Sequence, residues 1–367
     1  MSRAVPLLST LFALFLALPA AAQGEAVLRG RVVAADGAST AGMRVHAGWP
    51  ASLDARPHRD SATVDAAGRF VLPLPDSLPD SVTVVVDAAD PALRAHHPAV
   101  ARVPRAQVRD RQHGFVLAPL EWLVPGGTYA GRRVPISPTL ARQAPCAGCS
   151  GFWVRMGGPR GGTGFQGWIA TRFPLRVAFE RGGSVPVGAV PDSAAFWRAA
   201  GEVEDALGED LFRPVPFAAT LPRHAEEDPG DVVLVRIDRT LTTGGLTTMV
   251  GSRGNIEYAG LALQRAGALL EPRGLELVRH ELMHVLGLGH TCAWRSVLAD
   301  VGRCPRMAAP APTPQDVAYT QLLYRVRALQ RDGTLRWGLD VATDAERLPA
   351  WDTVGEDARD GEGGSPG

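Results

Sequence analysis

The most informative stretch of the sequence is HELMHVLGLGH, residues 280–290, which holds three of the nine histidines of the chain. His280 and His284 are four residues apart, so on a helix both side chains lie on one face and can reach one metal ion. Gly287 can adopt the left-handed conformation that ends a helix and reverses the chain. The reversal brings back His290 as a third nitrogen ligand. This spacing therefore predicts a metal site.

The chemistry expected here is that of a catalytic zinc ion. Three neutral imidazoles at roughly 2.0–2.1 Å leave the fourth position of a tetrahedral zinc open for water, whereas a structural site is closed by four protein ligands. We therefore expect one catalytic Zn2+ bound by His280, His284 and His290, with Glu281 on its open side. For structural calcium the sequence gives no indication. The alternative, a helix that merely carries surface histidines, leaves the five fixed positions of the motif unexplained.

An amphipathic helix is expected to position the motif. The stretch PRGLELVRHELMHVLG, residues 272–287, has a proline near its first turn, where proline is tolerated. Its apolar residues recur at helical spacing and form a stripe that packs inward. The stripe consists of Leu275, Val278, Leu282 and Val285.

The same reading places further elements on both sides of this helix. Strands are expected at 173–182, 211–219, 231–239, 245–254 and 258–265, the last two meeting at a turn around Gly254 and Asn255. Helices are expected at 192–208, capped by Asp192 or Ser193, and at 313–329, capped by Thr313. One face of the first helix is apolar: Phe196, Ala200, Val203 and Leu207.

The pattern HExxHxxGxxH resembles the signature of the metzincin zinc endopeptidases. The order of elements is similar to that of the N-terminal subdomain of this clan, and TPQDVAYTQLLY resembles the helix that follows in matrixin-type members. The resemblance covers about residues 165–335. It implies that the three histidines bind zinc and that Glu281 is the general base. It also implies that one strand of the region 246–262 lies along the cleft, as an edge to which an extended peptide adds.

The resemblance further implies a methionine turn beneath the metal. Spacing from His290 puts Leu298 at the expected place, whereas Met307 could fill it if Cys292 and Cys304 close an inserted disulfide loop. We prefer Met307. No cysteine switch of the matrixin kind is visible in the sequence.

The N-terminal third has the pattern of short strands separated by turns. Strands are expected around 27–37, 41–49, 61–74 and 80–90, with Val82 to Val86 buried and tight turns at Asp36-Gly37 and Ala67-Gly68. Strands at this spacing favour a small β-sandwich. The phrases GRVVAADG, AGMRV and TVDAAGRFVLPL resemble carboxypeptidase-regulatory-like, or transthyretin-like, modules, which implies an Ig-like accessory domain without catalytic residues. His96 and His97 are expected to be solvated.

The N-terminus is expected to direct export. An apolar run from Leu7 to Leu18 is shorter than the roughly 20 residues that span a bilayer, and Ala20 and Ala22 fit a cleavage site before Gln23. We expect a secreted or periplasmic protein without a transmembrane segment. In such a compartment the cysteines favour local disulfides, Cys146–Cys149 and Cys292–Cys304.

The chain is therefore expected to be multidomain, with a β-sandwich followed by an α+β metzincin-like domain built on a mixed twisted sheet and an active-site helix. The expected parts are a signal peptide at 1–22, the β-sandwich at 25–118, a Gly/Pro-rich connector at 119–164, the metzincin-like domain at 165–338 and an acidic disordered tail at 339–367.

The function expected from these features is hydrolysis of protein or peptide substrates. Basic and acidic residues balance at 38 each, which leaves no net field to attract nucleic acid. Two alternatives stay open: a secreted binding protein with a relic zinc site, and a zinc hydrolase that acts on amide bonds of cell-wall peptide. The intact Glu281 argues against the first. Oligomeric state has no signal in the sequence.

Overall fold

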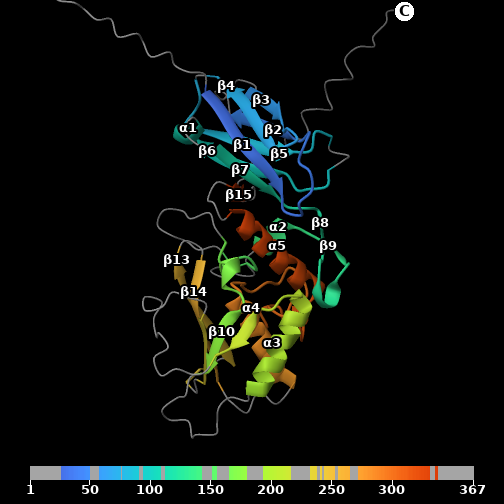
Figure 1. The fold of residues 1–367 in the computed structure, drawn as a ribbon, viewed down its shortest axis with the longest axis vertical. Coiled ribbons are helices and arrows are strands. Elements are labelled where there is room, and N and C mark those ends of the chain that lie inside the picture. Colours follow the sequence, from blue (N-terminus) through green and yellow to red (C-terminus); the bar gives the residue numbers. More distant parts are fainter. Residues whose placement is uncertain are drawn as a thin grey trace, which may run out of the picture.

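The structure is a computed structural model of the chain. It describes residues 26–49, 58–75, 77–90, 94–108, 112–142, 151–154, 165–179, 193–215, 232–237, 240–241, 244–252, 255–264, 272–330 and 335–337. The expected signal peptide, the Cys146–Cys149 pair and the expected acidic tail lie outside these residues. Two lobes are visible, one built from strands and one from strands and helices (Figure 1).

The first lobe consists of two four-stranded sheets. Their strands run in the orders β15-β7-β1-β4 and β3-β2-β5-β6. The bounds are β1 Ala26–Ala34, β2 Arg44–Trp49, β3 His58–Thr63, β4 Arg69–Leu74, β5 Ser81–Asp87, β6 Ala99–Pro104, β7 Gln112–Leu117 and β15 Leu335–Trp337, and a short helix α1, Arg105–Val108, follows β6.

Alternation of side chains along these strands builds one core between the two sheets. Val82, Val84 and Val86 of β5 are fully buried, and their neighbours on the strand are only partly buried. Phe70 and Phe115 come from the other sheet and belong to the same cluster. The expected turns are confirmed, because Gly37 and Gly68 both have the positive φ that tight turns need.

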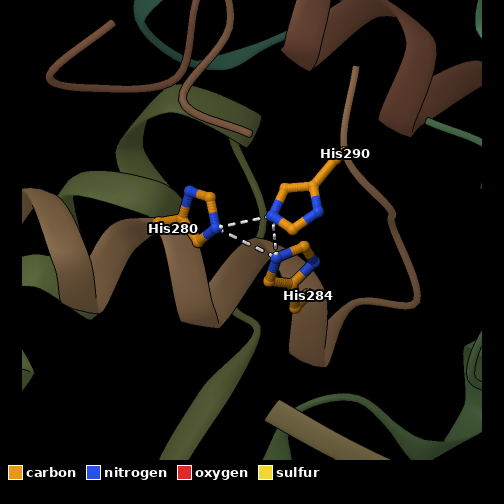
Figure 2. Close-up of side chains that lie close together, drawn as sticks. All are labelled: His280, His284 and His290. Carbon is orange, nitrogen blue, oxygen red and sulfur yellow. Dashed lines mark hydrogen bonds between the residues drawn. The ribbon is translucent and has the colours of Figure 1, made fainter. Parts of the chain in front are cut away.

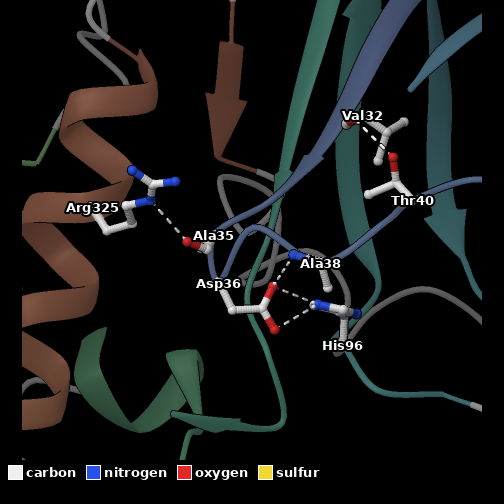
Figure 3. A network of polar contacts seen from close by, with 7 residues as sticks. All are labelled: Val32, Ala35, Asp36, Ala38, Thr40, His96 and Arg325. Carbon is white, nitrogen blue, oxygen red and sulfur yellow. Dashed lines mark hydrogen bonds and ion pairs between the residues drawn. The ribbon is translucent and has the colours of Figure 1, made fainter. Parts of the chain in front are cut away.

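The expectation of a solvated His96-His97 pair was wrong. His96 is only 5% exposed, and its Nε2 lies 3.1 Å from Oδ1 of Asp36 (Figure 3). His97 Nε2 donates to the main-chain carbonyl oxygen of Ile136 at 2.6 Å. Both imidazoles therefore join segments that are distant in sequence, which an adjacent pair of polar residues does not reveal.

The segment expected to be a connector has a structure of its own. It forms the antiparallel pair β8, Glu121–Leu123, and β9, Arg133–Pro135, with the 3-10 helix η2, Gly127–Tyr129, between them and helix α2, Pro138–Arg142, after them. Buried side chains of this segment belong to the core of the second lobe. They include Trp122, Val124, Val134, Ile136, Phe152 and Trp153. Because glycine and proline are abundant in this segment, its sequence pattern did not predict that these apolar side chains are buried.

The second lobe is built on a mixed five-stranded sheet with the order β11-β10-β12-β14-β13. The strands are β10 Leu175–Phe179, β11 Phe212–Pro214, β12 Val232–Ile237, β13 Gly245–Ser252 and β14 Asn255–Leu263. All neighbours are parallel except the outermost pair, β13 and β14. The helices are α3 Ser193–Leu207, α4 Pro272–Val285 and α5 Pro314–Gln330, with 3-10 turns η3 Ala170–Arg172 and η5 Pro305–Met307. Each strand and helix expected here from the sequence is present at least in part, whereas Gly254 of the expected turn and the alternative cap Asp192 lie outside the described residues.

The chain returns to the first lobe after α5. Strand β15 pairs in parallel with β7, so residues 335–337 complete the sheet of the first lobe and do not belong to the domain expected at 165–338. Arg325 of α5 also donates through Nε to the carbonyl oxygen of Ala35 at 3.1 Å (Figure 3). The two lobes are therefore joined by main-chain strand pairing and by a side chain that donates to a main-chain carbonyl, and hydropathy patterns predict neither contact.

Candidate metal centre

Helix α4 carries the motif and is fixed by its apolar stripe. Leu275, Val278, Leu282 and Val285 are all buried, as expected from their spacing. Helix α4 packs on α3 and on the last two strands of the sheet, β13 and β14. Arg279 adds an ion pair with Glu202 of α3. The polar face of the helix is thereby presented in one defined orientation.

The end of α4 is closed by groups from distant segments. Gly287 has φ +89°, and a Cβ there would lie 2.9 Å from the carbonyl oxygen of Gln166. Trp168 donates its indole N–H to the carbonyl oxygen of Val285 at 2.7 Å, and Tyr324 donates its hydroxyl to that of Leu286 at 2.8 Å. These bonds satisfy carbonyls that a helix C-terminus leaves without partners. The turn that redirects the chain is therefore held by packing as well as by glycine.

The three histidines converge on one point (Figure 2). The Nε2 atoms of His280 and His284 are 3.0 Å apart, and each lies 3.2–3.3 Å from Nε2 of His290. Ligand nitrogens of a tetrahedral zinc with bonds of about 2.05 Å stand about 3.3 Å apart. The residues present therefore fit a zinc ion.

Neighbouring carbonyl oxygens determine which ring nitrogen carries the proton in two of these imidazoles. Nδ1 of His280 lies 2.7 Å from the carbonyl oxygen of Val297, and Nδ1 of His284 lies 2.7 Å from that of Leu288. Because a carbonyl oxygen only accepts, both Nδ1 atoms donate, and the Nε2 atoms keep their lone pairs.

The electrostatics of the triad also favour neutral rings. Burial lowers the pKa of His280 to about 4 and lowers that of His284 still more clearly, with the neighbouring imidazoles acting in the same direction. Burial lowers the pKa of His290 as well. Lone pairs that converge within 3.3 Å repel one another unless a cation lies between them. The chemistry of this donor set therefore calls for a metal ion.

The loop after His290 is pinned by a disulfide and by a buried carboxylate. The expected Cys292–Cys304 disulfide is present. Asp316, at the start of α5, accepts hydrogen bonds from Trp294 Nε1 at 2.9 Å, Ser296 Oγ at 2.6 Å, Val297 N at 3.0 Å and Thr313 N at 2.9 Å. Burial raises the pKa of Asp316, and these hydrogen bonds oppose that rise. Since Val297 supplies the acceptor for His280, Asp316 supports the candidate metal ligands indirectly.

Leu298 and Met307, the two residues expected to compete for the methionine-turn position, differ in burial. Leu298 is fully buried in the turn at 296–299, where the amide of Ala299 donates to the carbonyl oxygen of Ser296. The amide of Thr291 also donates to the carbonyl oxygen of Leu298. Met307 lies in η5 and is only partly buried. The Cys292–Cys304 disulfide encloses this turn and Met307 follows it, so the preference for Met307 stays a prediction.

Glu281 is buried beside the first histidine. It is 4% exposed, and burial raises its pKa to about 7, which a hydrogen bond from Thr247 opposes. Thr247 belongs to β13, whose register with β14 runs from Gly245 opposite Leu263 to Ser252 opposite Asn255. The strand next to the glutamate is thus an edge strand of the sheet. A carboxylate whose pKa is near neutrality can both accept and return a proton.

Several residues of the site carry no recognisable pattern in the sequence. Thr247, Trp168 and Tyr324 contact the motif or its helix from 34 or more positions away. Asp316 contacts only the loop at 294–297, whose Val297 carbonyl accepts from His280. A threonine in a strand and a tyrosine in an amphipathic helix are ordinary residues. The only partial signal was the TPQD sequence, in which Thr313 was expected to cap α5 and Asp316 lies at the start of the helix.

No known family model matches the chain, and no curated protein or solved structure is significantly similar to it. Within the part of the chain that the structure describes, no helix has both the length and the apolar character needed to cross a membrane.

Proposed function

We propose that this protein is a zinc-dependent endopeptidase of the metzincin type, in which His280, His284 and His290 bind zinc and Glu281 is the general base. The observation that carries the proposal is the convergence of three Nε2 lone pairs within 3.0–3.3 Å, beside a buried glutamate. A structural zinc site has four protein ligands and no use for such a carboxylate.

Zinc, when bound, supplies a Lewis acid and lowers the pKa of water to about 7. Glu281 accepts the proton of the attacking water and passes it to the leaving amine. Nδ1 of His280 and Nδ1 of His284 hold their rings in place through the carbonyl oxygens of Val297 and Leu288, so the ligand nitrogens do not have to reorganise during turnover.

The substrate of this proposal is an extended polypeptide. Strand β13 ends the sheet, and among the described residues no other strand pairs with its outer edge. The main-chain N–H and C=O groups on this outer edge can therefore pair with a peptide that adds as a further strand. Because Thr247 of this strand contacts Glu281, a peptide bound there lies close to the base.

The test uses purified full-chain protein and measures zinc content by elemental analysis together with cleavage of unfolded casein. We expect one zinc per chain and cleavage that a chelator abolishes. Glu281→Ala should keep the zinc and lose cleavage, because it removes the base and no ligand. Glu276→Ala, on the same helix but without a role in the site, is the matched control and should cleave normally.

Two results would contradict the proposal. Absence of zinc in the wild type after purification in zinc-containing buffer would remove the metal site. Zinc in every variant without cleavage of casein or of any peptide in a mixed library would instead favour a binding protein, or a hydrolase of cell-wall amide bonds, which purified cell wall as substrate would identify.

A further inference from the structure

Strand β13 holds the glutamate from two sides. The hydroxyl of Thr247 lies 2.7 Å from Oε2 of Glu281 and 3.2 Å from the main-chain carbonyl oxygen of the same residue. A threonine hydroxyl has one proton to donate, and the carboxylate oxygen is the nearer acceptor. The side chain of Glu281 is therefore tied to the outermost strand of the sheet.

The second contact is with Gly245, because the carboxylate of Glu281 occupies the space that a side chain at this position would need. A Cβ at this position would lie 2.6 Å from Oε1 and 2.9 Å from Cδ of Glu281. Real Cβ atoms do not approach so closely, so the carboxylate occupies the place that any larger residue would need. The two oxygens of Glu281 are thus distinguished: one accepts from a hydroxyl and the other packs against glycine.

We propose that Thr247 is a positioning residue, which fixes the carboxylate of Glu281 in the orientation needed for proton transfer. The inference deepens the proposed function and rests on it. A general base acts only within hydrogen-bond distance of the proton that it takes, and small misplacements are costly. An orienting partner behind the base is a recurrent solution to this requirement.

The position of Thr247 gives this contact a second consequence. Along β13 the exposed residues, Leu246, Thr248 and Val250, alternate with residues that are partly buried, which include Thr247 and Met249. Thr247 is thus on the side of the strand that faces α4, while its main chain belongs to the edge proposed to bind substrate. The same strand therefore sets both the path of the peptide and the orientation of the base.

The matched set of variants is Thr247→Val, Thr247→Ser and Thr63→Val, each loaded with zinc. Valine keeps the shape of threonine and removes the hydroxyl, so we expect kcat to fall about 10- to 100-fold with KM and zinc content within about twofold of wild type. Serine restores the donor and should keep kcat within about threefold. Thr63 is an exposed residue of β3 in the first lobe, so its valine variant removes a hydroxyl from a strand outside the site and should keep the kcat of wild type.

The inference fails if Thr247→Val keeps the kcat of wild type. It also fails if Thr247→Ser loses as much as the valine variant, because the methyl group and not the hydroxyl would then matter. A fall in zinc content or a rise in KM alone would assign Thr247 a role in folding or in peptide binding and would overturn positioning of the base.

A readout independent of turnover separates this inference from the proposed function. In a crystal structure of the zinc-loaded wild type, the Thr247 hydroxyl should donate to Oε2 of Glu281. In a crystal structure of Thr247→Val, the Glu281 side chain should be rotated or occupy two conformers. An unchanged Glu281 in the variant would overturn the inference. A wild type that binds zinc but cleaves nothing would refute the peptidase, while the crystal structures still decide the role of Thr247.

Discussion

Replacing Asp316 tests how far the candidate metal site depends on a residue that contacts none of the three histidines. Its carboxylate accepts hydrogen bonds from Trp294, Ser296, Val297 and Thr313. The first three are 8%, 0% and 5% exposed, so water cannot replace the lost acceptor without rearrangement. An unsatisfied buried donor costs about 1–3 kcal/mol, so Asp316→Ala should lower the free energy of unfolding by about 3–5 kcal/mol.

The isosteric variant Asp316→Asn separates the effect of losing one acceptor oxygen from the effect of losing the whole carboxylate. The amide keeps one acceptor oxygen and turns an NH2 group towards the remaining donors, so we expect a loss of about 2 kcal/mol. Because Val297 carries the carbonyl that orients His280, the affinity for zinc should also fall about tenfold, as is usual for partners of metal ligands.

Urea unfolding in the presence of a chelator measures the stability term, and competition with a zinc indicator measures the affinity. Asp210→Asn changes an exposed carboxylate and serves as the control for charge. A loss below about 1 kcal/mol in Asp316→Ala would refute the reasoning on stability. Unchanged zinc affinity in Asp316→Asn would show that the loop does not transmit its position to His280.

Three further outcomes are expected. Gly287→Ala should lower the free energy of unfolding by about 1–3 kcal/mol, because φ is +89° and the new Cβ meets a carbonyl oxygen at 2.9 Å; thermal unfolding and zinc content check this. The double variant Cys292→Ser/Cys304→Ser should lose about 2–3 kcal/mol in urea unfolding, since a 12-residue separation is no longer cross-linked. Burial raises the pKa of Tyr324 to about 12, so the folded state binds its proton more tightly and loses stability as pH rises from about 10 to about 12; Tyr324→Phe should flatten this part of a pH–stability profile.

Local spacing determined much of the candidate site. The interval of four between His280 and His284 follows from helix periodicity, and the glycine that allows His290 to return requires no knowledge of distant residues. The same holds for the buried stripe of α4 and for the alternating strands, because periodicity depends only on neighbours along the chain. The pair Cys292–Cys304 was also predictable from proximity in sequence.

Contacts between distant segments were decided only by the tertiary structure. Thr247 reaches Glu281, Asp316 reaches the 294–297 loop, and Trp168 caps the end of α4. Each is a single polar group whose partner depends on how sheets and helices pack. The full burial of Leu298 and the partial burial of Met307 were also decided by packing, and which of the two lies beneath the metal stays a prediction.

The boundaries of the lobes were likewise set by packing. Trp122 and Trp153 lie in a glycine- and proline-rich segment, yet both are buried in the core of the second lobe. The strand at 335–337 completes a sheet formed more than two hundred residues earlier. Main-chain hydrogen bonds of this kind depend little on residue type, so sequence patterns do not predict them. The sequence by itself determined which residues could bind a metal ion, and the tertiary structure decided which distant groups hold those residues in place.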